Sequence, residues 1–256
     1  MNWKRPFLSL GKALEGVQSW AQIGERKRSR VDLEESFKLS CFPMNSDLDR
    51  ENGVLASGRA TDGARFLRVI GRIDSLNNED PKRVSIGDES IGYELHFSRL
   101  LFAKALYLFP EASEAFLLAA RGQHICRWES PRSNYPEGRA GYLKWRSDLK
   151  RFHADETAKA LESEGYGPAT IERVRSINMK KDLKHNNEAQ AMEDVLCLVF
   201  LESQFADFRH KTTEEKMVSI LRKTWGKMSD RGKEAASSLD LEEEEKRLID
   251  LALGGA

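Results

Sequence analysis

Between residues 119 and 153 the sequence gathers side chains that can bind anions, metal ions and protons. This stretch holds two of the five histidines, two of the five tryptophans, two of the seven prolines and a series of arginines. The segments on either side have the apolar periodicity of ordinary amphipathic helices. We therefore expect the functional site to be built around this stretch, with the flanking helices holding it in place.

Arginines alternate with aromatic residues here, a combination suited to gripping phosphates and stacking on bases. Tyr142, Arg146 and His153 recur at steps of four and seven, which places them on one face of a helix. The sequence thus predicts a site for a phosphorylated small molecule or a nucleotide, with RNA as a possible partner. The residues expected to bind the phosphate or substrate are Arg127, Arg132, Arg139, Tyr142 and Arg146.

A divalent metal ion is the expected cofactor. Asp194 belongs to the most apolar helical segment, and a buried carboxylate costs several kcal/mol unless it meets a metal, an arginine or a proton. Imidazoles and a carboxylate from separate helices are how a bundle builds such a site. We expect His153 and Glu193 to act catalytically. The expected metal ligands are His96, His124, His153 and Asp194.

Packing offers an alternative interpretation of both the expected phosphate-binding residues and the expected metal ligands. A single histidine such as His124 on an apolar helix face is commonly a hydrogen-bonded core residue. Arginines and aromatic rings can simply hold an irregular loop on the core. In that interpretation Asp194 makes an ion pair with one of three arginines, which are Arg127, Arg139 and Arg146.

Helical periodicity recurs with few strand signals, which predicts an all-α fold with a single helical bundle. Residues 63–254 are expected to form the domain, and residues 1–62, which are polar or basic, a largely disordered tail or linker. Residues 77–92 are expected to be a loop. The expected helices cover residues 64–76, 93–109, 113–124, 141–161, 169–178, 188–208, 217–228 and 239–253.

The totals exclude several classes of protein. Forty-one basic residues balance 41 acidic ones, so nothing global favours nucleic acid or an anionic membrane. Three cysteines without a close pair argue against a disulfide framework or a cysteine zinc site. No apolar run approaches the ~18 residues of a membrane span. We expect a cytoplasmic protein, with organelle import through the basic N-terminal segment as an alternative.

One resemblance is to the HD-domain phosphohydrolases. His96-x-x-Arg99, followed by an Ala/Leu-rich helical hairpin that ends at His124, is similar to the opening of that superfamily. The resemblance implies an HD-like helical arrangement and a metal ion that activates water for phosphate-ester hydrolysis. It places the ligands at His96, His124 and Asp194, with His153 as an accessory. Ile125 stands where the superfamily has the aspartate of its His-Asp pair.

A second resemblance, over about residues 64–240, is to the uncharacterised DUF4202 proteins. Its signatures are Gln123-His124-Ile125-x-Arg127-Trp128, Pro131-Arg132-x-x-Tyr135-Pro136, Arg139-Ala140-Gly141-Tyr142-Leu143-x-Trp145-Arg146, His153-Ala154, and Glu193-Asp194-Val195-x-Cys197-Leu198-Val199-Phe200-Leu201-Glu202. Some members are labelled glutamyl-tRNA synthetase, and residues 227–231, KMSDR, resemble the ATP loop of such enzymes. A class I synthetase needs a parallel-stranded Rossmann domain. We therefore expect these residues to form an ordinary helix end.

Three functions follow from these patterns. The first is metal-dependent hydrolysis of a phosphorylated small molecule or nucleotide. The second is a non-catalytic helical module that binds a nucleotide or a structured RNA such as tRNA. The third, aminoacylation, depends on the KMSDR similarity and the synthetase label alone.

Overall fold

The computed structural model describes residues 47–183 and 185–254. Residues 1–46 of the tail or linker predicted over 1–62 lie outside the described residues. Helices dominate, as the sequence predicts, and the described part of the chain forms an all-α fold with one small hairpin. None of the described helices is both long and apolar enough to cross a membrane.

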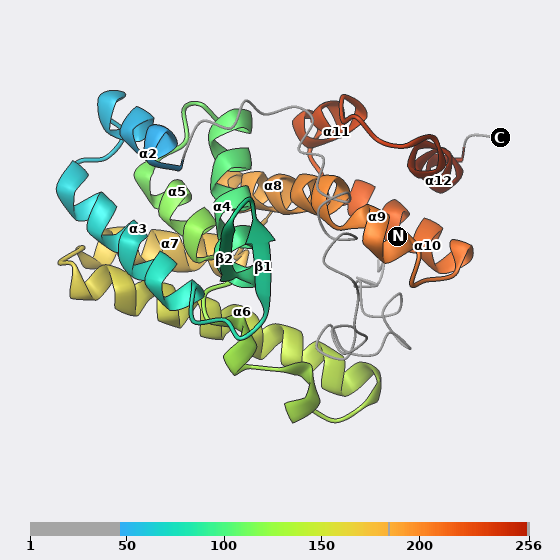
Figure 1. The fold of residues 1–256 in the computed structure, drawn as a ribbon, viewed down its shortest axis with the longest axis horizontal. Helices are drawn as coiled ribbons and strands as arrows, with labels where there is room; N and C mark the ends of the chain where they lie inside the picture. The colour runs from blue at the N-terminus through green and yellow to red at the C-terminus, as the bar shows by residue number, and fades with distance from the viewer. Residues whose placement is uncertain (1–46, 184, 255–256) are drawn as a thin grey trace, which may run out of the picture.

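The first half of the domain is a set of helices packed on α4 (Tyr93–Leu108). Helices α3 (Gly63–Asn77) and α5 (Glu114–Gly122) lie against α4, and α6 (Gly138–Ser163) and α7 (Pro168–Met179) cover α5. Figure 1 shows α3, α5 and α7 gathered on one side of α4. The shared core includes four fully buried phenylalanines, at positions 66, 102, 116 and 205.

The second half starts with α8 (Asn187–Ser203), which packs on α4 and carries the chain to the C-terminal helices at the right of Figure 1. Helix α9 (Phe205–Arg209) follows a break at Gln204, so the single helix predicted over 188–208 is two helices. Then come α10 (Glu214–Trp225), α11 (Asp230–Ser237) and α12 (Glu243–Leu253), with α12 lying on α10. Helix α11 occupies part of the segment expected between the last two helices.

Two segments expected to be irregular are ordered. Helix α2 (Asp47–Ala56) lies in the predicted linker, and it is held because the Val54 side chain is fully buried in the core. The predicted loop at 77–92 contains an antiparallel hairpin of β1 (Arg83–Ile86) and β2 (Glu89–Gly92). Gly87, with φ of +56°, makes the reversal between the strands possible. Strands this short carry little periodic signal, which explains the wrong prediction.

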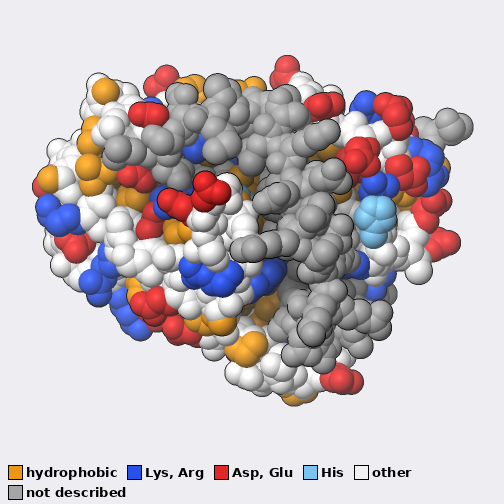
Figure 2. Space-filling model, in the orientation of Figure 1, with side chains coloured by type: hydrophobic (Ala, Val, Ile, Leu, Met, Phe, Trp, Pro, Cys, Tyr) orange, Lys and Arg blue, Asp and Glu red, His pale blue; other side chains and the backbone are white. Residues whose placement is uncertain are grey.

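Charges are spread over the surface. Figure 2 shows acidic and basic side chains interspersed over the described surface in view, in keeping with the balanced totals. Among the described residues, Arg121 is a cation that lies in the interior instead. Arg121 is fully buried, and its Nε and Nη2 donate to the two carboxylate oxygens of Asp74 over 2.7 and 2.5 Å. Its guanidinium also lies 5.1 Å from the centre of the Phe102 ring. This pair ties α5 to α3.

We expect Arg121→Ala to lower the free energy of unfolding by about 3 to 5 kcal/mol, because it leaves the Asp74 carboxylate partly buried without its main partner. Urea denaturation would measure the loss. The matched control is Arg68→Ala, which removes an exposed pair with Glu164 and should cost less than about 1 kcal/mol. Equal small losses in both variants would contradict the structural role of the buried pair.

Candidate functional site

His124 and His153 are brought together, as the sequence predicts for two of the four expected ligands. His124 follows the end of α5, and its ring stacks between Phe97 and His153, at centroid distances of 4.5 and 5.5 Å. Its Nδ1 lies 3.5 Å from a carboxylate oxygen of Glu94. The two imidazoles therefore form one stacked pair at the junction of α4, α5 and α6.

His153 has a defined tautomer. Its Nδ1 lies 2.8 Å from the backbone oxygen of Ile125, and because a carbonyl can only accept, Nδ1 carries the proton. The lone pair is then on Nε2, which is buried and has no hydrogen-bond partner among the described residues. The ring is 2% exposed. His153 thus has an unused proton acceptor.

Both imidazoles stay neutral near pH 7. Burial lowers the pKa of His124 and His153 well below the ordinary value, and the nearby Arg127 and Arg146 lower it further. Neutral imidazoles can accept a proton from a reacting group, whereas imidazolium cannot. Each neutral imidazole therefore keeps a lone pair that can accept a proton.

Glu94 lies beside the imidazoles at the start of α4. The hairpin fixes it there, because Asp80, just ahead of β1, accepts from the backbone N–H of both Lys82 and Glu94, over 2.8 and 3.1 Å. Burial raises the pKa of Glu94 to about 7, although Arg127 opposes the shift with its Nε 3.7 Å from the carboxylate. Glu94 therefore exchanges its proton near neutral pH.

The loop after α5 turns sharply to bring Arg127 next to His124. Cys126 has φ of +52°, and its backbone N–H donates to the side chain of Asn77 over 3.2 Å. The Arg127 guanidinium then lies 5.4 Å from the Trp145 ring centre. Burial raises the pKa of the Cys126 thiol to about 12. The turn is thus held by backbone contacts and packing.

A group of basic side chains extends from the histidines to Glu193. Lys180 ends α7, is 11% exposed and forms an ion pair with Glu193. The Nζ of Lys227, in the turn after α10, is 2.7 Å from the second carboxylate oxygen of Glu193. We call the following residues the basic cluster, since each one influences the ionisation of another member or of a histidine: Arg127, Arg146, Lys150, Lys180 and Lys227.

Glu193 is predicted to be catalytic, but the structure gives it a positioning role. Burial would raise the pKa of Glu193, yet Lys180 and Lys227 outweigh burial and hold it well below its ordinary value. The carboxylate therefore stays ionised, and its two oxygens each accept from one lysine. Glu193 holds these two ammonium groups in place.

Asp194 does not reach the histidines. Its oxygens accept from the Ser229 backbone N–H at 2.8 Å, the Ser229 hydroxyl at 2.5 Å and the Gln190 amide at 3.1 Å. The expected ion pair with an arginine is absent from the described contacts as well. Ser229 caps the start of α11, so Asp194 anchors that helix to α8.

His96 also lies apart from the imidazole pair. It follows Glu94 by two positions in α4, and two positions turn a helix by about 200°. Since Glu94 is at His124, His96 is on another face of the helix. Within residues 47–183 and 185–254, no group of three or more His, Cys, Asp or Glu side chains is placed to hold a metal ion. The four expected ligands are therefore not gathered into one group in the described part of the chain.

Of the predicted phosphate-binding residues, some lie at the site and others lie apart from it. Arg127 and Arg146 belong to the basic cluster. Tyr142 lies near both of them: burial raises the pKa of its hydroxyl, and the two arginines oppose that shift. Arg132 instead donates to the backbone oxygens of Tyr135 and Pro136 over 2.9 and 2.8 Å, which shapes the loop before α6. Arg139 is exposed in the first turn of α6.

Four residues of the site are not among those predicted from the sequence, namely Glu94, Lys150, Lys180 and Lys227. The sequence pattern does not single out Lys180, and it predicts an ordinary helix end at Lys227. Lys150 had a usable signal, because it lies four positions after Arg146 and three before His153. Glu94 has no such signal in the sequence, because its place beside His124 depends on the contact of its backbone N–H with Asp80.

The segment resembling a synthetase ATP loop is a structural turn. The Gln190 amide donates to the Lys227 backbone oxygen over 2.9 Å, and Arg231 donates to the backbone oxygen of Leu108. A Cβ at Gly232 would lie 2.7 Å from the Asp194 carboxylate, which explains the glycine. In the part of the chain with described structure, the β-structure is one antiparallel hairpin, so the parallel sheet of a class I synthetase has no counterpart there.

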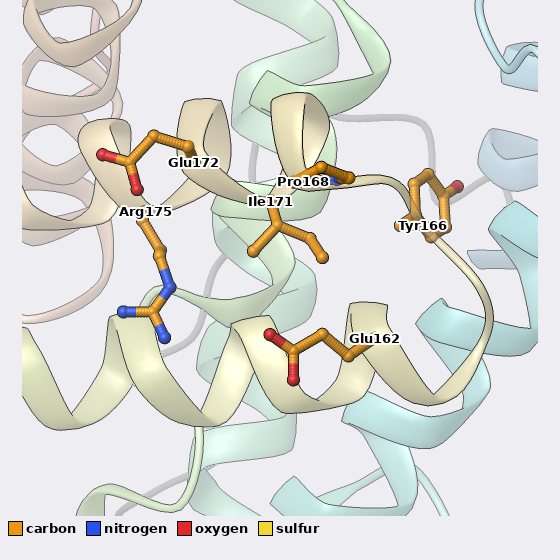
Figure 3. A pocket seen from close by; sticks show the side chains of 6 residues that line it. All are labelled: Glu162, Tyr166, Pro168, Ile171, Glu172 and Arg175. Carbon is orange, nitrogen blue, oxygen red and sulfur yellow. The ribbon is translucent and has the colours of Figure 1, made fainter.

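A shallow groove lies between α6 and α7, away from the predicted residues. Figure 3 shows Glu162 on α6 opposite Ile171, Glu172 and Arg175 on α7. Arg175 is paired with Asp155, and the Tyr166 hydroxyl donates to Glu114 over 2.5 Å. With its basic side chain already paired, this groove does not suit an anionic ligand.

The comparisons with known proteins give one match. A family model described as "Domain of unknown function (DUF4202)" matches residues 67–249. No curated protein and no solved structure matches the chain.

Asp194→Ala should lower the free energy of unfolding by about 2 to 3 kcal/mol, because it removes three hydrogen bonds to a charged acceptor and the anchor of α11. Chemical denaturation would measure this loss. The control is Asp230→Ala, which alters an exposed carboxylate in the same helix and should change stability by less than about 0.5 kcal/mol. An Asp194 variant as stable as the control would contradict the anchoring role.

Glu94→Gln should become more stable relative to wild type as the pH rises from 4 to 8, by roughly 3 kcal/mol. In wild type the folded state keeps the Glu94 proton up to a pKa of about 7, whereas the unfolded chain releases it near 4.5, so stability is lost across that window. Glutamine has no proton to lose. Denaturation of both proteins across this pH range would measure the difference, with Glu162→Gln as the exposed control. A difference that stays constant with pH would refute the shift.

Proposed function

We propose that this chain, which belongs to the DUF4202 family, binds a phosphorylated small molecule or nucleotide at the basic cluster and hydrolyses its phosphate ester beside His153. The single observation that carries the proposal is a buried, neutral imidazole with an unpartnered Nε2 next to a group of cations. Because the matching family has a domain of unknown function, support comes from the residues of the site.

Charge supports an anionic ligand. The five cations of the basic cluster face two nearby carboxylates, those of Glu94 and Glu193, and Glu94 is partly protonated at neutral pH. Among the described residues assigned to the site, cations therefore outnumber carboxylates. Arginine presents paired donors that match phosphate oxygens, and lysine adds point charge. A phosphate group would supply the missing negative charge.

Proton transfer supports hydrolysis. In the proposed reaction, the unpartnered lone pair on His153 Nε2 accepts a proton from the water molecule that attacks phosphorus. Glu94 is close to His124 and holds its proton up to about pH 7, so it can donate to a leaving oxygen. The cations of the basic cluster would stabilise charge that develops on the phosphoryl oxygens. In this scheme the side chains of the chain itself bind the ligand and move the protons.

A non-catalytic binding module is the second candidate. The observation that favours it is the surface at Tyr142, whose half-buried ring lies next to Arg127 and Arg146 and 5.9 Å from the buried Trp145 ring. Such a surface can stack a base without any chemistry. Binding without turnover would select this candidate over the hydrolase.

Arg146→Ala should weaken the binding of a phosphorylated ligand by roughly tenfold to a hundredfold, because it removes a cation next to both imidazoles. Titration calorimetry with inorganic phosphate and with a panel of nucleoside phosphates would measure the change. The matched control is Arg139→Ala, on the same helix but exposed, which should bind like wild type. Equal affinity in both variants would overturn the phosphate site.

His153→Gln should reduce the hydrolysis of para-nitrophenyl phosphate by about a hundredfold or more, the usual contribution of a general base. The control is His185→Gln, which alters a histidine that is 77% exposed and should leave the rate unchanged. Each assay is run with and without a chelator. A wild-type rate that the chelator abolishes and a divalent ion restores would instead support metal-dependent hydrolysis. No turnover with any phosphate ester would leave binding alone.

A further inference from the structure

Lys150 lies on the same face of α6 as the catalytic histidine. Arg146, Lys150 and His153 are separated by four and three positions, and side chains with this spacing follow one stripe of a helix. His153 is buried against the turn at Ile125, and Lys150 is half-buried one turn earlier. The Lys150 side chain therefore extends from the face of α6 that forms the site.

Charged groups from four segments of the chain lie close enough to Lys150 to affect the ionisation of its amine. Arg146 comes from α6 itself, Lys180 from the end of α7, Lys227 from the turn after α10 and Glu193 from α8. The two oxygens of Glu193 are already taken by Lys180 and Lys227. Among the residues that the structure describes, Lys150 makes no ion pair and no side-chain hydrogen bond, unlike its two lysine neighbours.

This arrangement favours the neutral form of the amine. Burial, together with Lys180 and Arg146, lowers the pKa of Lys150 to about 8. About one amine in ten is then neutral at pH 7, against fewer than about one in a thousand for an ordinary lysine. A neutral amine next to cations that attract anions is the usual setting of a nucleophilic lysine.

We propose that Lys150 is a nucleophilic amine that forms an imine with a phosphorylated aldehyde or ketone whose phosphate is held by Arg146, Lys180 and Lys227. The inference rests on the proposed phosphate site and narrows its ligands to phosphorylated carbonyl compounds. Lys150 Nζ adds to the carbonyl carbon, and one amine proton passes to the carbonyl oxygen. The second amine proton leaves with that oxygen as water, and a carbon–nitrogen double bond remains.

The test uses pyridoxal 5′-phosphate, a phosphorylated aldehyde, followed by borohydride reduction and peptide mapping by mass spectrometry. We expect labelling at Lys150 to exceed that at Lys144 and Lys159 by at least tenfold. These two lysines are internal controls, because they lie on the same helix, are each 67% exposed and are paired with Asp148 and Glu156. The rate of labelling at Lys150 should rise with pH, with a midpoint near 8.

Three further experiments distinguish reaction at a phosphate site from non-specific labelling of lysines. Inorganic phosphate should protect Lys150, and pyridoxal without the phosphate should label it at least tenfold more slowly. Lys150→Arg keeps the charge and should lose the label, with an unchanged melting temperature as the check of folding.

Two results would overturn the inference in distinguishable ways. Uniform labelling of the exposed lysines, or labelling confined to Lys180 or Lys227, while phosphate still binds, would remove the role of Lys150 and leave the proposed function standing. Equal labelling of Lys150 by pyridoxal and its phosphate, without protection by phosphate, would overturn both the phosphorylated ligand and the proposed phosphate site.

Discussion

The hydrogen bond between His153 and the backbone oxygen of Ile125 determines how the rest of the site is used. It joins α6 to the turn after α5, and it assigns the proton of the imidazole to Nδ1. The lone pair of Nε2 is then left inside the protein without a described partner. His124 stacks on this fixed ring, so the position of His153 also helps to fix the position of the His124 imidazole.

Adjacent acidic residues of α8 serve different sites because successive helical positions are about 100° apart. Glu193 points to the lysines of the basic cluster, and Asp194 points to the cap of α11. The turn from Lys227 to Ser229 links the two, since its lysine contacts Glu193 and its serine contacts Asp194. Helix α11 therefore supports the site although it contributes no residue to it.

The sequence predicts the long helices because their apolar residues recur over many turns, and it predicts the pairing of His124 with His153. It does not predict the hairpin, whose strands are too short for a periodic signal. The predicted metal set includes His96 and Asp194 because both are polar residues on apolar helices. Their partners, however, depend on which face of each helix meets which neighbour. Glu94 and Lys180 enter the site through tertiary contacts that spacing along the chain does not encode.

The turn at Cys126 has a consequence for redox chemistry. Its left-handed backbone costs about 1 to 2 kcal/mol for a residue with a side chain, and packing holds it between His124 and Arg127. With a pKa of about 12, the sulfur is almost entirely protonated at neutral pH, and the thiolate is the form that oxidants and alkylating agents attack. The chain thus places a cysteine between two site residues and keeps it in the thiol form, which reacts slowly with peroxide and disulfides.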